Sequence, residues 1–278
     1  MAIRYSAVEP LEPWRALSLS ELVNQVSGQW FNDLLEENRI ISHYQPIYNL
    51  KSCRVIGFEA LARGVDSSGL RSGFELVTAA CRLGLKNEFD HHARLAAITC
   101  LYNQLTPDEL IFINLNPASF GHGCDDLHSA VFAMRGAGID PDQVVFEFVE
   151  ADQFPGENAL LNLVACIREA GAKIALDDFG SGHSTIAMAE IIRPDIIKFD
   201  RTLLQPTDDE AKEILLTSLV NFAKSLGAQT VAEGIETLSQ LALAERCGFD
   251  HIQGWLVSRP AARLQRPELA LQKSLPET

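Results

Sequence analysis

Short apolar runs alternate with amphipathic segments along most of the chain. Six runs are apolar over nearly their whole length, as buried strands are, and they cover residues 110–116, 144–150, 173–179, 196–200, 229–234 and 251–257. The segments between them carry apolar residues at helical spacing, and several end at a glycine, as residues 158–171 and 211–227 do. Strands that alternate with helices in this way predict a parallel sheet covered by helices.

Two more strands are predicted before this series, at residues 43–50 and 55–63, and a helix is predicted to begin near Ser20. About eight strands in 278 residues fit a closed α/β barrel of the TIM-like (β/α)8 type. An open doubly wound sheet is the alternative, although no Gly-x-Gly-x-x-Gly follows the first strand. We expect a partly helical N-terminal lead-in (residues 1–30), the barrel (31–270) and a C-terminal tail (271–278).

Composition narrows the set of partners. The chain has 23 basic and 37 acidic residues and a formal net charge of −14, which argues against DNA or an anionic membrane as the main partner. No stretch of 18 apolar residues predicts a membrane span, and the N-terminus lacks the apolar region of a signal peptide. The six cysteines lie far apart in the sequence, which predicts reduced thiols. We therefore expect a cytoplasmic protein.

Polar residues stand at the carboxyl ends of successive predicted strands, where the catalytic groups of parallel barrels lie. They are Glu59, Asn114, Glu147, Asp177 with Asp178, Lys198 with Asp200, Glu233 and Gln253. Any one of them alone would be a surface or capping residue, but seven successive strand ends with such groups indicate a site. Carboxylate and amide oxygens are ligands for Mg²⁺ or Mn²⁺. This many oxygen donors suits two metal ions, the arrangement used to hydrolyse phosphodiesters.

Asp177 and Asp178 are the most informative pair, because two adjacent carboxylates at the end of a buried strand need a cation nearby. Neighbouring strand residues point to opposite faces. The two carboxylates can therefore share one site only if the backbone turns at once, which residues 179–182 (Phe-Gly-Ser-Gly) permit.

Four other residues have more than one possible role. Arg63, four residues after Glu59, is suited to grip a phosphate or to pair with a surface acid. Lys198 is suited to stabilise negative charge or orient a water, or else it forms an ordinary buried ion pair. Of Glu233 and Glu236, one is expected to hold a metal or activate water, while the other caps a helix N-terminus.

In their order, these motifs resemble the EAL family of bacterial cyclic-di-GMP phosphodiesterases. The resemblance spans roughly residues 31–265 and is carried by Gln45-Pro-Ile, Glu59-Ala-Leu with Arg63, Asn114, residues 147–150, 177–182, 195–200, 232–237 and 253–260. It implies a modified barrel whose first strand runs antiparallel to the rest. A kinase reading of Asp-Phe-Gly fails for want of a His-Arg-Asp loop and a glycine-rich phosphate loop.

The resemblance also implies roles. Glu59, Asn114, Glu147 and Asp177 would bind one Mg²⁺ or Mn²⁺, and Asp177 and Asp178 the second, with Glu233 as a further candidate ligand. Lys198 and Glu233 would place and activate the attacking water. The substrate-binding set would be Gln45, Arg63, Asp200, Glu236 and Gln253. Glu150, Gly180, Ser181 and Gly182 would couple the active-site loop to a homodimer contact.

The expected reaction opens one phosphodiester of cyclic di-GMP to linear pGpG, with Ca²⁺ as an inhibitor. Val149, Ser181, His183 and Asn116 depart from the family pattern, but none of them replaces a ligand. A module that binds cyclic di-GMP without hydrolysing it is the second hypothesis, and an unrelated metal-dependent barrel hydrolase is the third. A sensory domain or partner outside this chain is also expected.

Overall fold

Eight strands close into a barrel in the computed structural model, which describes residues 19–67, 69–101, 103–116, 125–149, 156–180, 185–205 and 210–267. Around the barrel the strand order is β1-β9-β8-β7-β6-β5-β4-β2, and pairing of β1 with β2 closes it. The strands are β1 (Ile40–Asn49), β2 (Arg54–Asp66), β4 (Leu110–Leu115), β5 (Val144–Val149), β6 (Lys173–Phe179), β7 (Ile196–Phe199), β8 (Gln229–Ala232) and β9 (His251–Ile252).

Strand β1 runs antiparallel to both of its neighbours, β2 and β9, while the strands from β2 through β4 to β9 are parallel. The predicted modified (β/α)8 barrel with one antiparallel strand is therefore confirmed. A short strand β3 (Gly69–Arg71), which the sequence pattern did not predict, forms a hairpin with the end of β2.

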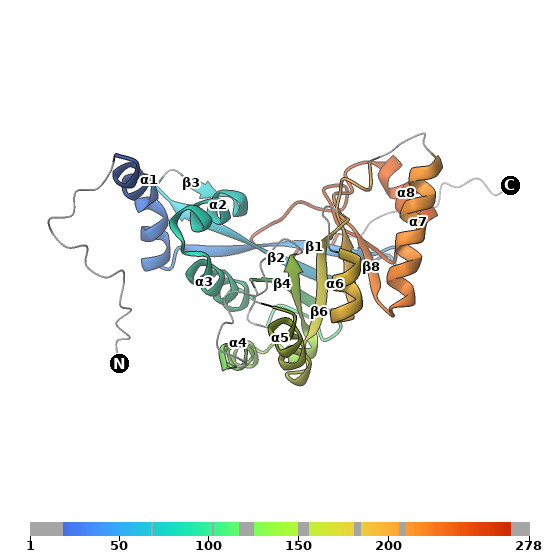
Figure 1. Ribbon diagram of the computed structural model, residues 1–278, viewed down its shortest axis with the longest axis horizontal. Helices are drawn as coiled ribbons and strands as arrows, with labels where there is room; N and C mark the ends of the chain where they lie inside the picture. The colour runs from blue at the N-terminus through green and yellow to red at the C-terminus, as the bar shows by residue number, and fades with distance from the viewer. Residues whose placement is uncertain are drawn as a thin grey trace.

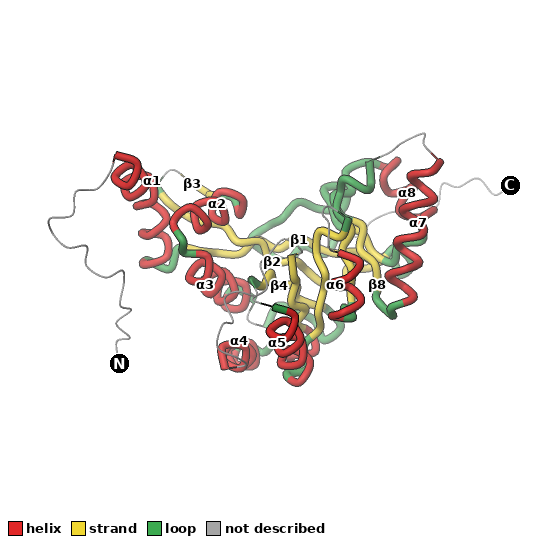
Figure 2. Tube along the Cα trace, in the orientation of Figure 1, coloured by secondary structure: helices red, strands yellow, loops and turns green. Residues whose placement is uncertain are grey.

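Helices pack against the barrel strands and against the hairpin that extends from them (Figures 1 and 2). They are α1 (Leu19–Glu36), α2 (Gly73–Leu83), α3 (Lys86–Thr99), α4 (Asp125–Gly136), α5 (Glu157–Glu169), α6 (Thr185–Ile192), α7 (Glu210–Ser225) and α8 (Leu238–Cys247). None of the helices that the structure describes is both long and apolar enough to cross a membrane.

The first three helices pack together where the long β1–β2 hairpin extends from the barrel (Figure 1). Phe31 and Leu34 of α1 are fully buried against Leu76 of α2 and Phe89 of α3. Trp30 joins this group and stacks beneath the Arg71 guanidinium at 4.9 Å. The end of the predicted lead-in thus packs as a helix that continues to Glu36.

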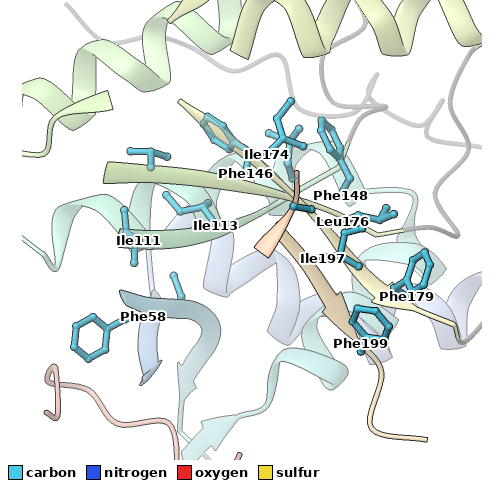
Figure 3. Close-up of a cluster of buried hydrophobic side chains, with 14 of the residues drawn as sticks. Phe58, Ile111, Ile113, Phe146, Phe148, Ile174, Leu176, Phe179, Ile197 and Phe199 are labelled. Carbon is cyan, nitrogen blue, oxygen red and sulfur yellow. The ribbon is translucent and has the colours of Figure 1, made fainter. Parts of the chain in front are cut away.

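The outer face of the barrel is covered by aromatic and branched side chains. Alternate residues of neighbouring strands face the helices, and the largest of them are labelled in Figure 3, among them Ile111, Ile113, Phe146, Phe148, Ile174, Leu176, Ile197 and Phe199. Each buried side chain of this size stabilises the fold by about 1.5–3 kcal/mol relative to exposure. This layer fixes which residues of each strand point inward.

The interior of the barrel holds a smaller apolar layer, contributed by Ile47, Phe112, Val145, Ala175, Ile196 and Val231. Side chains of a strand alternate between its two faces. The residue two positions further along each parallel strand therefore points inward as well, one level closer to the carboxyl end. Polar and ionic residues occupy that level.

Cys166 corrects one expectation. The thiol prediction holds for Cys53, Cys81, Cys100 and Cys247, which are free, but Cys166 in α5 is disulfide-bonded. Distance along the sequence does not limit which sulfurs meet in the fold, so wide spacing was poor evidence against a bond.

Buried His251 is expected to make stability depend on pH. Its Nδ1 lies 3.2 Å from Asn49 Nδ2 and its Nε2 lies 3.4 Å from Gln229 Oε1, and burial lowers its pKa to about 4. The unfolded chain takes up a proton near pH 6.5 that the folded protein does not bind until about pH 4. Stability is therefore lost as pH falls through this window, by about 2 kcal/mol between pH 7 and 5.

This expectation is checked by urea unfolding of the wild type and of His251→Gln at both pH values. The variant should lose less stability than the wild type between pH 7 and 5. The exposed His91, changed to Gln, is the control and should behave like the wild type. An identical pH dependence in the wild type and His251→Gln would contradict the assignment.

Candidate metal centre and active site

The inward-facing level above the apolar layer brings one residue from each of several strands to a common centre. Asn114, Glu147, Asp177, Lys198 and Glu233 each stand two residues after a member of the apolar layer. Glu59 of β2 and Gln253, which directly follows β9, complete the ring from the two strands beside β1. Period-two alternation in parallel strands of matched register is sufficient to produce this convergence.

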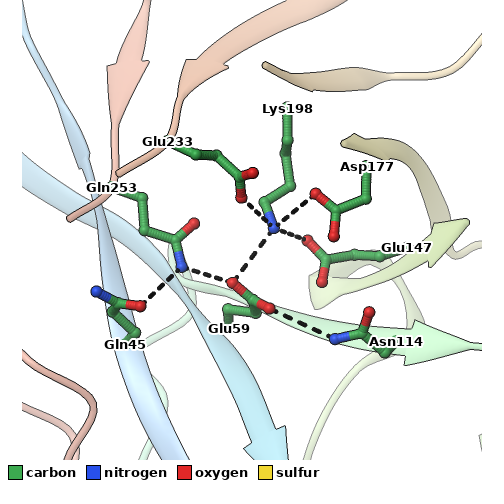
Figure 4. A network of polar contacts seen from close by, with 8 residues as sticks. All are labelled: Gln45, Glu59, Asn114, Glu147, Asp177, Lys198, Glu233 and Gln253. Atoms are coloured by element: carbon green, nitrogen blue, oxygen red, sulfur yellow. Dashed lines mark hydrogen bonds and ion pairs between the residues drawn. The ribbon is translucent and has the colours of Figure 1, made fainter. Parts of the chain in front are cut away.

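Lys198 lies at the middle of the ring and is fully buried (Figure 4). Its Nζ lies 2.8 Å from Glu147 Oε1 and 2.8 Å from Glu233 Oε1. The same nitrogen lies 3.1 Å from Asp177 Oδ1 and 3.2 Å from Glu59 Oε2. Four carboxylates thus share one ammonium group, so this is a charge cluster and not an ordinary ion pair.

Amide side chains hold Glu59 in place on the other side of the ring (Figure 4). Gln253 Nε2 donates to Glu59 Oε2 at 2.5 Å and to Gln45 Oε1 at 3.4 Å. Asn114 Nδ2 donates to Glu59 Oε1 at 3.4 Å. Gln45 Nε2 donates in turn to the carbonyl oxygen of Ser258 at 3.1 Å. These bonds fix the rotamer of Glu59 before any ligand binds.

The backbone turns between the two aspartates, as the sequence required for a shared site. Asp178 has a φ of 55°, and the register between β6 and β7 shifts between Leu176 and Phe179. Oxygen atoms of Asp177, Asp178 and Glu233 consequently lie within 4.8 Å of one another. Gly180 has a φ of 93°, and a Cβ there would lie 2.4 Å from Leu203 Cδ1, so a side chain at this turn would strain the backbone and displace Leu203.

Burial and mutual repulsion leave the carboxylates of the cluster poorly stabilised as anions. Burial raises the pKa values of Glu147 and Glu233 well above their ordinary range and raises that of Asp177, despite the attraction of Lys198. Burial and the neighbouring Asp177 raise the pKa of Asp178 to about 6. The cluster is therefore short of positive charge, and a divalent cation would correct this.

The donor set fits divalent metal ions. Carboxylate oxygens of Glu59, Glu147 and Asp177 lie within 4.8 Å of one another, and this group shares Asp177 with the group formed with Asp178 and Glu233. Glu147 Oε2 is buried and has no hydrogen-bond partner among the described residues. Two overlapping oxygen groups with one shared carboxylate suit two hard cations.

Two cavities reach this cluster from different sides. The larger, of about 620 Å³, is lined by Glu59, Asn114, Asp177 and Asp178 and extends to Arg63. The smaller, of about 310 Å³, is also lined by Glu59 and Asp178, and by Gln45, Asp200, Glu233, Glu236, Gln253 and Trp255. The carboxylate cluster thus borders both cavities.

Three predicted site residues lie outside the direct network. Arg63 lines the larger cavity and forms no ion pair with a described residue, so it is not paired with a surface acid there. Asp200 accepts a bond from the backbone N–H of Thr202 at 2.9 Å, and Glu236 is exposed. The N-cap of α8 is Thr237, so neither Glu233 nor Glu236 caps that helix.

The loop predicted to couple the site to a dimer lies only partly within the described residues. Gly180 is described above, whereas Glu150, Ser181 and Gly182 lie outside the described residues, as does His183.

Sequence reasoning did not select Phe74 or Trp255, each of which is exposed and lines one of the two cavities. A signal existed for Phe74. Ser72 and Glu75 have the spacing of a capping box, which marks a helix start and places Phe74 in the first turn, off the buried face.

Comparison with known proteins identifies the fold family. The sequence model of the EAL domain matches residues 29–260. The chain belongs to the EAL family. As an EAL domain it is 29% identical, over 235 residues, to the probable cyclic di-GMP phosphodiesterase PdeB of Escherichia coli K12. That match covers 82% of the chain and 44% of the relative, so the chain spans less than half of that protein's length.

Solved EAL structures superpose on the barrel. The manganese and cyclic di-GMP complex of Klebsiella pneumoniae BlrP1 has a TM-score of 0.72 and 30% identity, over 80% of this chain and 56% of that one. The PaMucR phosphodiesterase in complex with cyclic di-GMP has a TM-score of 0.71 and 25% identity, over 84% of this chain and 97% of that one.

Proposed function

We propose that this EAL domain hydrolyses one phosphodiester bond of cyclic di-GMP to give linear pGpG, and that it needs Mg²⁺ or Mn²⁺ to do so. One observation carries the proposal: four carboxylates surround Lys198 and, together with Asp178, form two oxygen groups that share Asp177. The names of the similar proteins, which refer to cyclic di-GMP, support the choice of substrate.

Seven residues receive proposed roles at the metals and the reacting water. One ion would be held by Glu59, Asn114, Glu147 and Asp177, and the other by Asp177, Asp178 and Glu233. Bound ions would polarise a phosphoryl oxygen and lower the pKa of a water. Lys198 Nζ and Glu233 Oε1 lie 2.8 Å apart, so the Lys198 ammonium would orient that water while the Glu233 carboxylate accepts its proton. The water oxygen would bond to phosphorus while the P–O3′ bond breaks, and the proton accepted by Glu233 would pass to the departing O3′ to give the 3′-hydroxyl of pGpG.

The remaining polar residues would bind the dinucleotide around the reacting phosphate. Gln45, Asp200, Glu236 and Gln253 line the smaller cavity, where hydrogen-bond donors and acceptors face the cluster. Arg63 lines the larger cavity, where its guanidinium suits a phosphate that is not being cleaved. A substrate with two phosphates and two bases matches two cavities that both border the carboxylate cluster.

The test is incubation of the purified protein with cyclic di-GMP and Mg²⁺ or Mn²⁺, with products separated by chromatography. We expect pGpG with either metal, none with EDTA, and inhibition by Ca²⁺, because the looser coordination of Ca²⁺ misplaces the water. Glu59→Ala should abolish product formation in a folded protein. Turnover with Ca²⁺ equal to that with Mg²⁺ would contradict the metal assignment.

Two other results would favour the alternative functions. Tight binding of cyclic di-GMP without pGpG, under either metal, would identify a sensor that binds without hydrolysis. Undiminished pGpG formation by Glu59→Ala would indicate a metal-dependent barrel hydrolase with a different centre. A homodimer coupled through residues 178–184, a sensory domain or partner, and a cytoplasmic location remain predictions.

A further inference from the structure

Phe74 is a large aromatic side chain held in solvent. It is 82% exposed, and it lines the same cavity of about 620 Å³ that reaches Glu59, Asn114, Asp177 and Asp178. Val77, one turn further along α2, is 47% exposed and lines the cavity too. An exposed apolar surface that is continuous with a candidate active site is suited to bind an apolar part of the ligand.

Hydrogen bonds and ion pairs hold the first turn of α2 in place. Ser72 Oγ accepts the N–H of Glu75 at 3.3 Å, and the Glu75 carboxylate accepts the N–H of Ser72 at 2.9 Å. Arg71 adds ion pairs to Glu75 at 3.2 Å and to Asp66 at 2.7 Å. The backbone that carries Phe74 is thus fixed before a ligand arrives, and a preorganised surface loses little entropy on binding.

The residue before Phe74 lies beside a cation. A Cβ added to Gly73 would lie 3.5 Å from Arg63 Nη1 and 3.3 Å from the carbonyl oxygen of Ala62. The Arg63 guanidinium therefore lies against the residue that precedes Phe74. The rest of the cavity wall includes the apolar residues Ala80, Phe89, Ala93, Ala97 and Ile113, together with the charged residues Lys86, Asp90 and Arg94.

A cation and an exposed aromatic ring that line one cavity match the two halves of a nucleotide. The guanidinium suits a phosphate, and the ring suits the face of a base. We propose that Phe74 is the stacking surface for one guanine base of cyclic di-GMP, the base that enters the larger cavity while Arg63 binds the adjoining phosphate. This inference rests on the proposed function and adds a specificity-determining residue to it.

The experiment compares Phe74→Ala and Phe74→Trp with the wild type. Stacking of a base on an aromatic side chain is lost on alanine substitution, so the KM of Phe74→Ala for cyclic di-GMP should rise about tenfold while kcat stays within about twofold. Phe74→Trp should keep a KM near that of the wild type. The new tryptophan should be quenched by cyclic di-GMP in Ca²⁺ more strongly than the tryptophans of the wild type.

Leu238→Ala is the matched control, because Leu238 is 71% exposed in the first turn of α8, also after a capping box, and lines neither cavity. It should leave KM unchanged. If the KM of Phe74→Ala stays within twofold of the wild type, or if the KM of Leu238→Ala rises as much, this inference is wrong while the proposed function stands. So would a sedimentation coefficient that changes in Phe74→Ala, since that would indicate a protein partner. Absence of both binding and turnover in the wild type would overturn the proposed function together with it.

Discussion

Lys198→Met is expected to destabilise the metal-free protein strongly and to be rescued by Mn²⁺. In the folded state Lys198 is the ammonium shared by Glu59, Glu147, Asp177 and Glu233, at 2.8–3.2 Å. Removal of one partner from a buried charge cluster typically costs about 3–5 kcal/mol, because the remaining charges lose their compensation. A bound divalent metal would supply the missing positive charge, so the loss of stability should be smaller in Mn²⁺ than in EDTA.

The loss of folding stability in metal-free Lys198→Met should also depend on pH, and the pKa values of the carboxylates determine its direction. Burial already raises the pKa values of Glu147 and Glu233 above their unfolded values, and removal of the ammonium raises them further. Acids with a raised pKa in the folded state take up protons on folding, so stability rises as pH falls through that raised range. The defect of metal-free Lys198→Met should therefore be larger at pH 8 than at pH 6.

Urea unfolding with EDTA and with Mn²⁺, at both pH values, measures these effects. Lys224→Met is the control, because Lys224 pairs with Asp250 at 3.1 Å at a partly exposed site, where an ion pair contributes about 1 kcal/mol or less. If Lys198→Met and Lys224→Met lose the same stability in EDTA, the four carboxylates do not depend on Lys198. In Mn²⁺ the folded variant should retain metal but lose about 10²–10⁴-fold in turnover, the range for a group that assists proton transfer.

The fold was predictable where hydrophobic periodicity determines it. The runs at residues 173–179 and 110–116 match β6 and, to within one residue, β4, because their outward residues are buried under helices and their inward residues in the barrel. The direction of β1 came from the family resemblance, since apolar alternation does not specify the direction of a strand.

The run at residues 251–257 shows where periodicity misleads. The strand ends at Ile252, although the apolar pattern continues. Gly254 packs so tightly on the backbone of Ile235 that a Cβ there would lie 2.1 Å from the Ile235 carbonyl oxygen, and the chain turns at that point. Close backbone contact between segments far apart in sequence leaves no trace in a hydrophobic pattern.

For the candidate site, the sequence predicted which residues form the ring but not how they contact one another. Strand-end position predicted that Glu59, Glu147, Asp177 and Glu233 would meet, because parallel strands bring their carboxyl ends together. It did not predict that Lys198 would contact all four, since spacing gives the face of a residue but not its depth. The larger cavity depends on α2 and α3, which pack from outside the barrel, so Phe74 could not be placed from the strands.

Asp177→Asn is expected to lower metal affinity and turnover together while sparing the fold. Asp177 belongs to both oxygen groups, so loss of its charge weakens two ions at once. We expect a fall in Mn²⁺ affinity greater than the ~10–100-fold that follows loss of an outer-sphere partner, with a comparable or larger fall in kcat. Metal-free stability should be unchanged or higher, because the cluster then holds one carboxylate fewer around Lys198.

Asp250→Asn should show the opposite pattern. Its Oδ2 accepts from the Thr230 backbone N–H at 2.9 Å and from Thr230 Oγ1 at 2.8 Å, so its role is structural. That variant should unfold more easily and bind Mn²⁺ as the wild type does. Electron paramagnetic resonance of free Mn²⁺, without substrate, measures affinity, and urea unfolding in EDTA measures stability. A wild-type rate for Asp177→Asn at saturating metal would remove Asp177 from the centre, because no other carboxylate is common to both oxygen groups among the described residues.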